Sequence, residues 1–324
     1  EQMIRNQGKD YIPQLFKFTQ IVIATNKNSV KYATCGTGKN FWCIWREQSA
    51  EWQNKLLDQY IVGREITEQD RNIVSLLAPE RLFKLTKYFV LYDANIKKIC
   101  RYQQFFAVEE IIRTIQQNDP AGNRQGGVIW HTQGSGKSLT MVMVAKYILM
   151  EMSRFNPRVV IVTDRKELDK QIAKTFAHTR LSPARATSGK HLIELVNSGS
   201  VDVITSIINK FNTVESSGLK NNSRDIFVLV DESHRSNYGS LATKMRTVFP
   251  NACYIGFTGT PLMKSEKNTM EKFGRLIHKY TIKDGVEDHA IVPLIYEGKF
   301  VEQSVDEASI DLWFDQVTKR LNDA

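Results

Sequence analysis

Residues 127–152 contain the parts of a phosphate-binding loop, in the order in which such a loop needs them. A short apolar run, GVIW, leads into a glycine-rich turn with Lys137 and Ser138, and a helix-forming segment, 139–152, follows. Glycines let backbone N–H groups approach phosphate oxygens, the lysine meets the β and γ phosphates, and the hydroxyl ligates Mg²⁺. The following helix directs the positive end of its dipole at the anion.

This turn departs from the common pattern G-x-x-x-x-G-K-[ST] at its first position, where His131 replaces glycine. Because the strand, the lysine, the hydroxyl and the helix are all present, we predict a nucleotide site here. Ser138 is a predicted Mg²⁺ ligand, and Lys137 is also a predicted catalytic residue. The predicted nucleotide-binding residues are His131, Thr132, Gln133, Gly134, Ser135, Gly136, Lys137 and Ser138.

A second turn of similar sequence, CGTGKN at 35–40, lacks three of these parts. Asn40 stands where Mg²⁺ needs a hydroxyl, and an aromatic, strand-like run, FWCIW, follows in place of a helix. The preceding stretch, VKYAT, is short and half polar. We therefore predict a β-turn with a solvated Lys39 and not a second nucleotide site.

Acidic residues follow another apolar run, IFVLV at 226–230. Asp231 at the end of such a strand is placed to hold Mg²⁺, and the neighbouring Glu232 is placed to orient and deprotonate an attacking water. His234 stands two residues further on. We predict Asp231, Glu232 and His234 as catalytic residues. A charged loop after a strand is common, so the partnership with the phosphate-binding loop carries this prediction.

A third polar segment, FTGTP, follows the apolar run that begins at residue 253. Thr258, Gly259 and Thr260 would stand at the same catalytic edge as the acidic residues. A Thr-Gly-Thr-Pro turn is also ordinary loop chemistry. The order and place of the segment favour a coupling role, in which it links the phosphate state to a nucleic-acid track.

Strands must position these three segments, and the sequence from residue 127 to 259 supplies them. Short apolar runs alternate there with helical segments, which is typical of an α/β fold with a parallel sheet and helices on both faces. Ligands of such sheets bind beyond the carboxyl ends of the strands. The runs are GVIW (127–130), RVVIVTD (158–164), VDVITS (201–206), IFVLVD (226–231) and CYIGFTG (253–259).

The pattern of apolar and polar residues divides the chain into four predicted segments. Residues 1–60 hold one clear strand, at 19–26, and the aromatic run. Residues 61–120 place apolar residues at helical spacing and end in a polar break. The α/β pattern occupies 121–285, and a connector with a final helix occupies 286–324.

Composition sets the class of protein and its surroundings. The 324 residues carry a formal net charge of +9, which is compatible with a polyanionic partner such as DNA. None of the four cysteines forms a C-x-x-C pair, so zinc is not expected, and single thiols suit a reducing cytoplasm. We expect no membrane contact, because no apolar run is long enough to span a bilayer.

The motifs GSGKS, DESH and FTGTP, in this order, resemble motifs I, II and III of superfamily 2 helicases and translocases of the DEAD/DEAH group. Nearly the whole chain is similar to the restriction (motor) subunit of type I restriction-modification enzymes, in HTQGSGKSLTM, VTDRKELDKQI, VDESHRS, GFTGTPL, RYQQFFAVEEI and KYATCGTGKNFWCIW. Ser233 stands where alanine is more usual in the acidic motif. The resemblance implies that 121–285 is the first RecA-like ATPase domain of a motor that uses ATP and Mg²⁺.

The same resemblance assigns further contacts. The residues before the phosphate-binding loop of such motors contact adenine, which makes Arg101, Gln103 and Gln104 candidates on the linker 61–120. By family position, segments after the second and third core strands meet the DNA backbone. The candidates there are Thr163, Arg165, Thr205 and Ser206. Polar residues on a helix or at a strand end are the alternative for both sets.

The resemblance also implies a larger assembly. It predicts an ATP-dependent duplex-DNA translocase within a bacterial or archaeal, cytoplasmic type I site-specific endonuclease, with methylase and specificity subunits as partners. Residues 1–60 would be the C-terminal part of an α/β nuclease domain of the PD-(D/E)xK type, without its metal ligands. Residues 286–324 would lead to a second RecA-like domain, absent here, that carries the arginine finger. We expect this polypeptide alone to bind ATP–Mg²⁺, hydrolyse it slowly and leave DNA uncut.

Two other interpretations remain open at this point. Another superfamily 2 motor, such as a type III restriction subunit or an RNA helicase, shares the three motifs but does not explain residues 1–60. A nucleotide-dependent scaffold that does not hydrolyse ATP is the second alternative. Glu232 argues against a scaffold, because binding alone needs no catalytic carboxylate.

Overall fold

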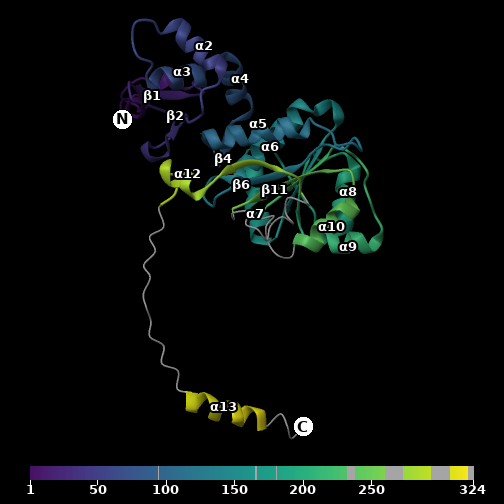
Figure 1. The fold of residues 1–324 in the computed structure, drawn as a ribbon. Helices are drawn as coiled ribbons and strands as arrows, with labels where there is room; N and C mark the ends of the chain where they lie inside the picture. Colours follow the sequence, from purple (N-terminus) through teal and green to yellow (C-terminus); the bar gives the residue numbers. More distant parts are fainter. Residues whose placement is uncertain are drawn as a thin grey trace. The chain divides into compact units, whose positions relative to one another are not determined.

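The computed structural model describes residues 1–93, 95–164, 166–179, 181–231, 238–259, 273–292 and 307–319 (Figure 1). It divides into two compact units, Glu1–Ile291 and Val292–Ala324. The described part of the second unit is one helix, α13 (Glu307–Lys319), which matches the predicted final helix. The first unit holds the predicted nucleotide site and all other elements named below.

A seven-stranded sheet forms the centre of the first unit, and every neighbouring pair in it is parallel. All five predicted runs are strands of this sheet, so the predicted α/β class is confirmed. Two edge strands, β12 and β8, were not predicted. In spatial order the strands are β12 (Leu276–Tyr280), β6 (Gly127–His131), β11 (Cys253–Thr258), β10 (Ile226–Val230), β7 (Arg158–Thr163), β9 (Val203–Ile207) and β8 (Ala184–Arg185).

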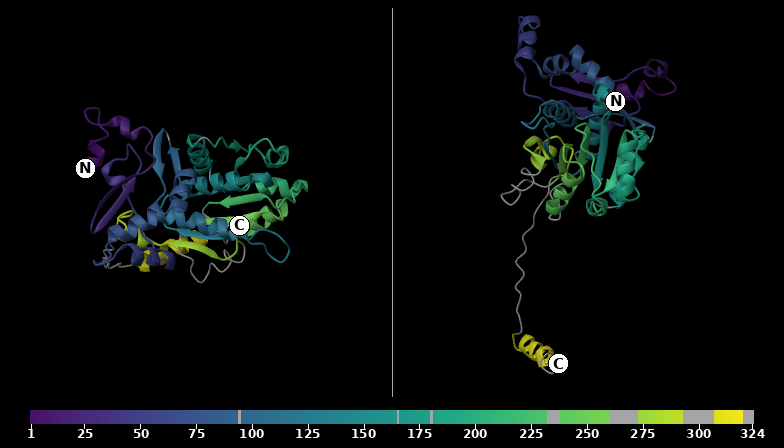
Figure 2. Two further views of the ribbon diagram at one scale, coloured as in Figure 1. Left: turned by 90° about the horizontal axis from the view of Figure 1, so that it is seen from above. Right: turned by 90° about the vertical axis from the view of Figure 1, so that its right-hand side faces the viewer.

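Helices cover both faces of the sheet (Figure 2). Successive side chains of a strand point to opposite faces, so one strand contributes to two apolar layers. Val159 and Ile161 of β7 join the layer with α5 (Tyr102–Ile115), α6 (Lys137–Glu151) and α7 (Lys166–His178). Val160 and Val162 join the opposite layer. That layer contains residues of α8 (Gly189–Ser198), α9 (Lys210–Ser217) and α10 (Tyr238–Val248).

The first hundred residues form a smaller antiparallel layer with its own helices. β1 (Val22–Asn26) pairs with β2 (Ser29–Ala33), and β2 pairs with β3 (Cys43–Ile44). Short helical turns, α1 (Gln2–Arg5), a 3-10 turn at Pro13–Phe16 and another at Lys39–Phe41, lie around these strands in the sequence. The longer helices are α2 (Glu51–Tyr60), α3 (Glu68–Leu77) and α4 (Pro79–Tyr88).

The segment after α4 corrects the sequence prediction. Helical spacing was predicted throughout 61–120, but α4 ends at Tyr88 and the chain forms a hairpin of β4 (Val90–Asp93) and β5 (Ile96–Ile99). Asn95 in the turn has a φ of 64°, a left-handed conformation that asparagine tolerates better than most residues. The predicted linker 61–120 is therefore not entirely helical, and the hairpin precedes α5 directly.

One apolar cluster joins this N-terminal layer to the seven-stranded sheet. Tyr32 of β2 and Phe89 lie in it together with Ile129 of β6, and all three side chains are fully buried. The Tyr32 hydroxyl also donates to the carbonyl of Cys100, just before α5, at 2.8 Å. The predicted boundaries at residues 60, 120 and 285 stay predictions. Residues from the first three predicted segments belong to the same apolar cluster.

A largely buried polar contact lies within the N-terminal layer itself. Glu47 accepts hydrogen bonds from the Trp45 indole at 2.6 Å, from the Ser75 hydroxyl at 2.7 Å and from Arg81 at 2.6 Å. The Arg81 guanidinium also lies over the Trp45 ring, 5.3 Å from its centroid. Each charged group has several partners, which offsets the desolvation that a buried ion pair costs.

A short helix, α12 (Ile282–Glu287), follows the edge strand β12 and is capped by Thr281. Among the described residues, no helix is both long and apolar enough to cross a membrane.

Candidate nucleotide-binding site

Three adjacent strands bring the predicted site residues to one edge of the sheet. In the register of the parallel strands, Trp130 of β6 pairs with Thr258 of β11, and Val230 of β10 pairs with Gly256 of β11. The segments beyond these strand ends are the phosphate-binding loop after β6, Asp231 after β10 and Gly259 after β11. The carboxyl edge therefore gathers the three motifs that the sequence placed there.

The phosphate-binding loop has the backbone that its glycines permit. Gly134 has a φ of 81° and Gly136 a φ of 91°, both in the left-handed region. Gly136 is the N-cap of α6, and Lys137 is the first residue of that helix. A Cβ on Gly136 would lie 2.6 Å from the Gln104 amide nitrogen, so both conformation and space require glycine here.

The polar atoms of the loop fit a phosphate ligand. The Ser135 side chain is buried, and its hydroxyl has no hydrogen-bond partner among the described residues. Lys137 directs its ammonium back over the loop, 3.3 Å from the carbonyl oxygen of His131. The ammonium also lies beside Gly259, where an added Cβ would be 3.1 Å from it. A buried hydroxyl without a partner, a lysine and a helix N-terminus together suit an anion.

Gln104 supports the loop directly. Its amide nitrogen donates to the carbonyl of Gly136 at 3.0 Å and lies 3.4 Å from the Thr140 hydroxyl. Its amide oxygen accepts from the backbone N–H of Arg101 at 2.9 Å. The predicted adenine contact of Gln104 stays a prediction, but in this structure its amide holds the loop and the start of α5.

The other two adenine candidates lie beside Gln104 at the beginning of α5. The Gln103 amide nitrogen and one terminal nitrogen of the Arg101 guanidinium are buried without hydrogen-bond partners among the described residues. Buried donors of this kind ordinarily find partners. Their contact with adenine likewise stays a prediction.

A cavity of about 510 Å³ adjoins the phosphate-binding loop. Gly134, Ser135 and Gly136 form one side of it, and Arg101 and Gln104 also line it. Most of the remaining lining comes from two segments that the sequence did not connect with the site, Gly36–Gly38 of the early turn and Ile96–Ile99 of β5. Asp93 and Asn95, which are common turn residues, were a signal for the hairpin that the sequence analysis left unused.

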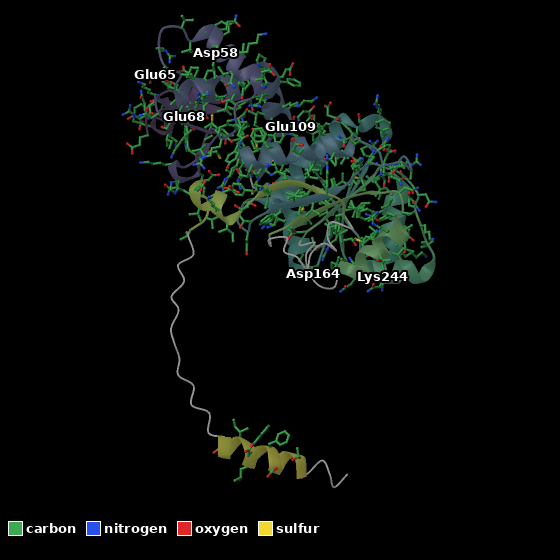
Figure 3. The ribbon with its side chains drawn as sticks, in the orientation of Figure 1. Asp58, Glu65, Glu68, Glu109, Asp164 and Lys244 are labelled. Atoms are coloured by element: carbon green, nitrogen blue, oxygen red, sulfur yellow. The ribbon has the colours of Figure 1, made fainter. Side chains whose placement is uncertain are left out.

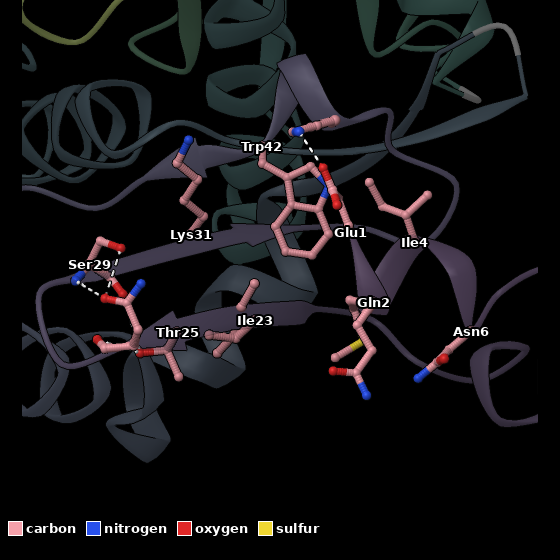
Figure 4. Close-up of a pocket in the computed structure, with 13 residues that line it drawn as sticks. Glu1, Gln2, Ile4, Asn6, Ile23, Thr25, Ser29, Lys31 and Trp42 are labelled. Atoms are coloured by element: carbon pink, nitrogen blue, oxygen red, sulfur yellow. Dashed lines mark hydrogen bonds and ion pairs between the residues drawn. The ribbon is translucent and has the colours of Figure 1, made fainter.

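The early turn itself has the features predicted for a turn. Gly36 has a φ of 80°, and only a three-residue 3-10 turn, Lys39–Phe41, follows. Lys39 is 70% exposed and pairs with Glu1 at 2.6 Å, beside a different cavity of about 610 Å³ (Figure 4). Its ammonium is thus committed to a surface carboxylate and not to the cavity at the phosphate-binding loop.

Asp231 directly follows β10, and its side chain is 7% exposed. Its backbone N–H donates to the carbonyl of Val162 on β7 at 2.9 Å. Two further predicted catalytic residues, Glu232 and His234, lie outside the described residues. In the coupling segment, Thr258 is buried at the end of β11, whereas Thr260 is outside the described part of the chain.

The predicted DNA-contacting hydroxyls do not reach the surface. Thr163, Thr205 and Ser206 at the ends of β7 and β9 each have 0% exposed area, and Arg165 lies outside the described residues. Asp164, next to Thr163 at the carboxyl edge, is partly exposed (Figure 3). DNA contact by these three hydroxyls stays a prediction that requires a rearrangement of the strand ends.

His131, at the position where the common pattern has glycine, is fully buried and has a partner that the sequence analysis missed. Its Nε2 lies 2.9 Å from Nδ1 of His278 on β12. Burial lowers the pKa of His131 well below its ordinary value, and the pKa of His278 to about 4. Both rings are therefore neutral at physiological pH.

Comparison with known proteins assigns the chain to a family. Residues 103–324 match the family model described as SWI2/SNF2 ATPase, and this match covers more than half of the chain. The protein belongs to the SWI2/SNF2 ATPase family.

Its curated relatives include endonuclease subunits of type I restriction enzymes, so the resemblance stated from the motifs is confirmed. The HindI subunit of Haemophilus influenzae is 33% identical over 315 residues, which are 89% of this chain and 29% of that protein. The SsaAORF53P subunit of Staphylococcus saprophyticus is 28% identical over 96% of this chain and 33% of its own length. The chain thus spans about a third of the length of these relatives.

Among solved structures, the SWI2/SNF2 ATPase core of Sulfolobus solfataricus in complex with double-stranded DNA is 16% identical. That similarity covers 58% of this chain and 37% of the other, with a TM-score of 0.42. The order and the parallel direction of the seven strands define the fold.

Proposed function

We propose that this chain is the ATP-binding part of a DNA translocase motor within a type I restriction endonuclease subunit. The observation that carries the proposal is the shared carboxyl edge. There the phosphate-binding loop after β6 and Asp231 after β10 flank the Thr258–Gly259 segment after β11. Similarity to type I endonuclease subunits over nearly the whole chain supports the choice of this motor over other ATPases.

The residues of the edge have separate roles in this proposal. Backbone N–H groups of Gly134–Gly136 and the ammonium of Lys137 hold the phosphates, while Ser138 and Asp231 hold Mg²⁺. Glu232 orients and deprotonates the attacking water. Bound ATP–Mg²⁺ supplies the phosphoanhydride bond whose hydrolysis drives the motor. Thr258, Gly259 and Thr260 couple the state of that bond to the DNA.

The cavity beside the loop offers a place for the base and ribose of the nucleotide. It is lined on one side by Gly134–Gly136 and on the others by Ile96–Ile99, Leu139 and the early turn. A largely apolar cavity with a few polar groups suits a nucleobase. In this proposal the early turn is a wall of the nucleotide site, although it binds no phosphate.

Double-stranded DNA and the methylase and specificity subunits are the proposed partners of the whole protein. The net charge of +9 favours association with a polyanion. Backbone contacts at the strand ends would position the DNA without reading its sequence. Target recognition is assigned to another subunit in this proposal.

Glu232→Gln in the full-length protein, assembled with its partner subunits, tests the proposal. We expect DNA-stimulated ATP hydrolysis to fall by about a hundredfold or more, because the attacking water loses its base, while ATP–Mg²⁺ affinity is retained. Steady-state hydrolysis with duplex DNA, and in parallel with RNA, is the measurement. Unchanged turnover in the variant, or stimulation by RNA in preference to duplex DNA, would contradict the proposal.

A further inference from the structure

The first two residues of the phosphate-binding loop are attached to the edge strand β12. The His131 Nε2 and the His278 Nδ1 are 2.9 Å apart, and their rings meet edge to face with centroids 5.1 Å apart. The next residue, Thr132, donates its backbone N–H to the carbonyl of Tyr280 at 2.9 Å. The loop therefore begins in a fixed position relative to β12.

The hydrogen-bonding pattern favours one arrangement of protons in the pair. The His131 Nδ1 is buried and has no partner among the described residues. If that nitrogen carried the proton, a buried donor would be left unsatisfied, which is costlier than an unsatisfied acceptor. The favoured arrangement has His131 Nε2–H donating to the His278 Nδ1, with both rings neutral.

The backbone of His131 reaches the reactive end of the loop. Its carbonyl oxygen accepts the Lys137 ammonium at 3.3 Å. The carbonyl carbon and the side chain of His131 are attached to the same Cα, and His278 holds the imidazole ring in place. The ring contact therefore limits how the backbone can rotate about this Cα. With glycine at this position, the hydrogen bond from the Thr132 N–H to Tyr280 would still hold the peptide, but the side-chain contact with β12 would be lost.

We propose that His131 and His278 are a positioning pair that holds the start of the phosphate-binding loop, and with it Lys137, in the shape that accepts a nucleotide triphosphate. This inference rests on the proposed ATP-binding function and deepens it. It also gives a physical reason for the departure from the glycine of the common pattern. Neither histidine contacts the nucleotide in this proposal.

Charged groups around the pair come from three helices. Lys137 of α6 acts on His131, and Glu110 of α5 and Asp284 of α12 act on His278. Burial outweighs both carboxylates and lowers the pKa of His278 to about 4. A lowered histidine pKa favours the neutral form, so the pair loses its hydrogen bond only when the pH falls far below 6. The positioning effect is therefore constant between pH 8 and 5.5.

Substitution of His278 tests the pair without touching the loop. In the 324-residue chain, we expect His278→Ala to weaken ATP–Mg²⁺ binding about five- to tenfold, as expected for a lost buried hydrogen bond. His278→Asn keeps a polar atom near the position of Nδ1 and should restore affinity to within about twofold of wild type. His289→Asn removes an exposed histidine beyond α12 and serves as the matched control. Titration calorimetry measures the affinities, and thermal unfolding checks that each variant folds.

A pH series separates positioning from packing. In His278→Ala, His131 regains a pKa nearer its ordinary value, and its protonation adds positive charge near the phosphates. The ratio of variant to wild-type affinity should therefore rise as pH falls from 7.5 to 5.5, while the ratio for His289→Asn stays constant.

The outcomes distinguish this inference from the proposed function. Wild-type affinity in His278→Ala, or an Asn variant that folds but binds as weakly as Ala, overturns the positioning pair. In that case a large loss in Lys137→Ala leaves the proposed ATP site intact. If wild-type protein does not bind ATP–Mg²⁺ and Lys137→Ala changes nothing, the proposed function and the pair both fail.

Discussion

The turns at 36–39 and 134–137 share the pattern Gly-x-Gly-Lys, yet their backbones diverge at the second glycine. Gly36 and Gly134 both have a φ near 80°, at 80° and 81°. Gly38, however, is extended, with a φ of −64°, whereas Gly136 has a φ of 91° and caps a helix. Several backbone N–H groups converge on one point only in the later turn, where the second glycine leads into a helix.

The two lysines differ in the same way. Lys39 follows an extended residue and extends outward to Glu1, with 70% of its side chain exposed. Lys137 starts a 15-residue helix and is held over its own loop by the His131 carbonyl. A helix start beside an ammonium adds N–H donors and a favourable dipole to the binding of a phosphate. The pattern Gly-x-Gly-Lys therefore does not identify a phosphate site unless a helix follows it.

The two turns nevertheless line the same cavity. Gly36–Gly38 and Gly134–Gly136 both line the space of about 510 Å³ in which we place the base of the nucleotide. The early turn contributes surface and shape, and the later loop contributes charge and N–H groups. The comparison therefore predicts that changes in the later loop abolish binding, whereas changes in the early turn tune it.

Loss of each lysine should give the largest contrast. Lys137→Ala removes a charged partner of the phosphates, and we expect ATP–Mg²⁺ affinity to fall by about a hundredfold, or roughly 3 kcal/mol. Lys39→Ala removes an exposed ion pair and should leave affinity within about twofold. Titration calorimetry on both variants of the 324-residue chain checks this. Comparable losses from both substitutions would make the early turn a second phosphate site.

Alanine at the second glycine of each turn should give the next largest contrast. At Gly136 it must adopt a left-handed φ, and its Cβ would come within 2.6 Å of the Gln104 amide nitrogen, which donates to the same residue's carbonyl. We expect a loss of about 2–3 kcal/mol of unfolding free energy and at least about tenfold weaker ATP binding. Chemical denaturation and calorimetry measure the two effects.

Gly38→Ala is the matched control for that substitution. Gly38 is extended, and an added Cβ would meet only the Phe41 ring, at 3.8 Å. We expect a change within about 0.5 kcal/mol, with stabilisation favoured because alanine restricts the unfolded chain. Equal destabilisation by both alanines would show that the different backbone conformations of Gly38 and Gly136 do not determine the effect of the substitutions.

The sequence predicted the motor sheet well because its strands are buried on both faces. Runs such as RVVIVT need no knowledge of their neighbours to be identified as strands, and the polar residues at their ends mark the carboxyl edge of the sheet. The phosphate-binding loop was predictable for the same reason, since strand, turn and helix are contiguous. These features depend on local pattern alone.

Features that depend on distant packing were missed. The contact between His131 and His278 joins residues 147 positions apart, and neither residue type indicates the other. The strand β4 was missed because the apolar residues around Phe89 also suit the helical spacing predicted for this part of the chain. That the early turn lines the cavity beside the phosphate-binding loop follows only from how the N-terminal layer packs on α5 and α6.

Filling the cavity from the early turn should produce a smaller and selective effect. Gly38→Trp places a large ring in the space assigned to the base, on a residue with an ordinary backbone conformation. We expect about tenfold weaker binding of ATP–Mg²⁺ and unchanged binding of inorganic tripolyphosphate, because the phosphate-binding loop is untouched. Competition titrations with the two ligands measure the difference. Equal loss of both would mean that the substitution disturbs the loop, and no loss would remove the base from this cavity.

The smallest expected effect concerns the ion pair that occupies Lys39. Lys39 lowers the pKa of Glu1 below its usual 4.5, mainly through their hydrogen bond. A lowered carboxyl pKa stabilises the protein at neutral pH, and this contribution is lost as the pH falls through the lowered value. Both side chains are largely exposed, at 70% and 82%, so solvent and salt screen the pair. We therefore expect Glu1→Gln to leave the Tm at pH 7 and the ATP–Mg²⁺ affinity unchanged. Tighter ATP binding in Glu1→Gln would instead mean that the released lysine reaches the nucleotide, and the two turns would then differ in degree and not in kind.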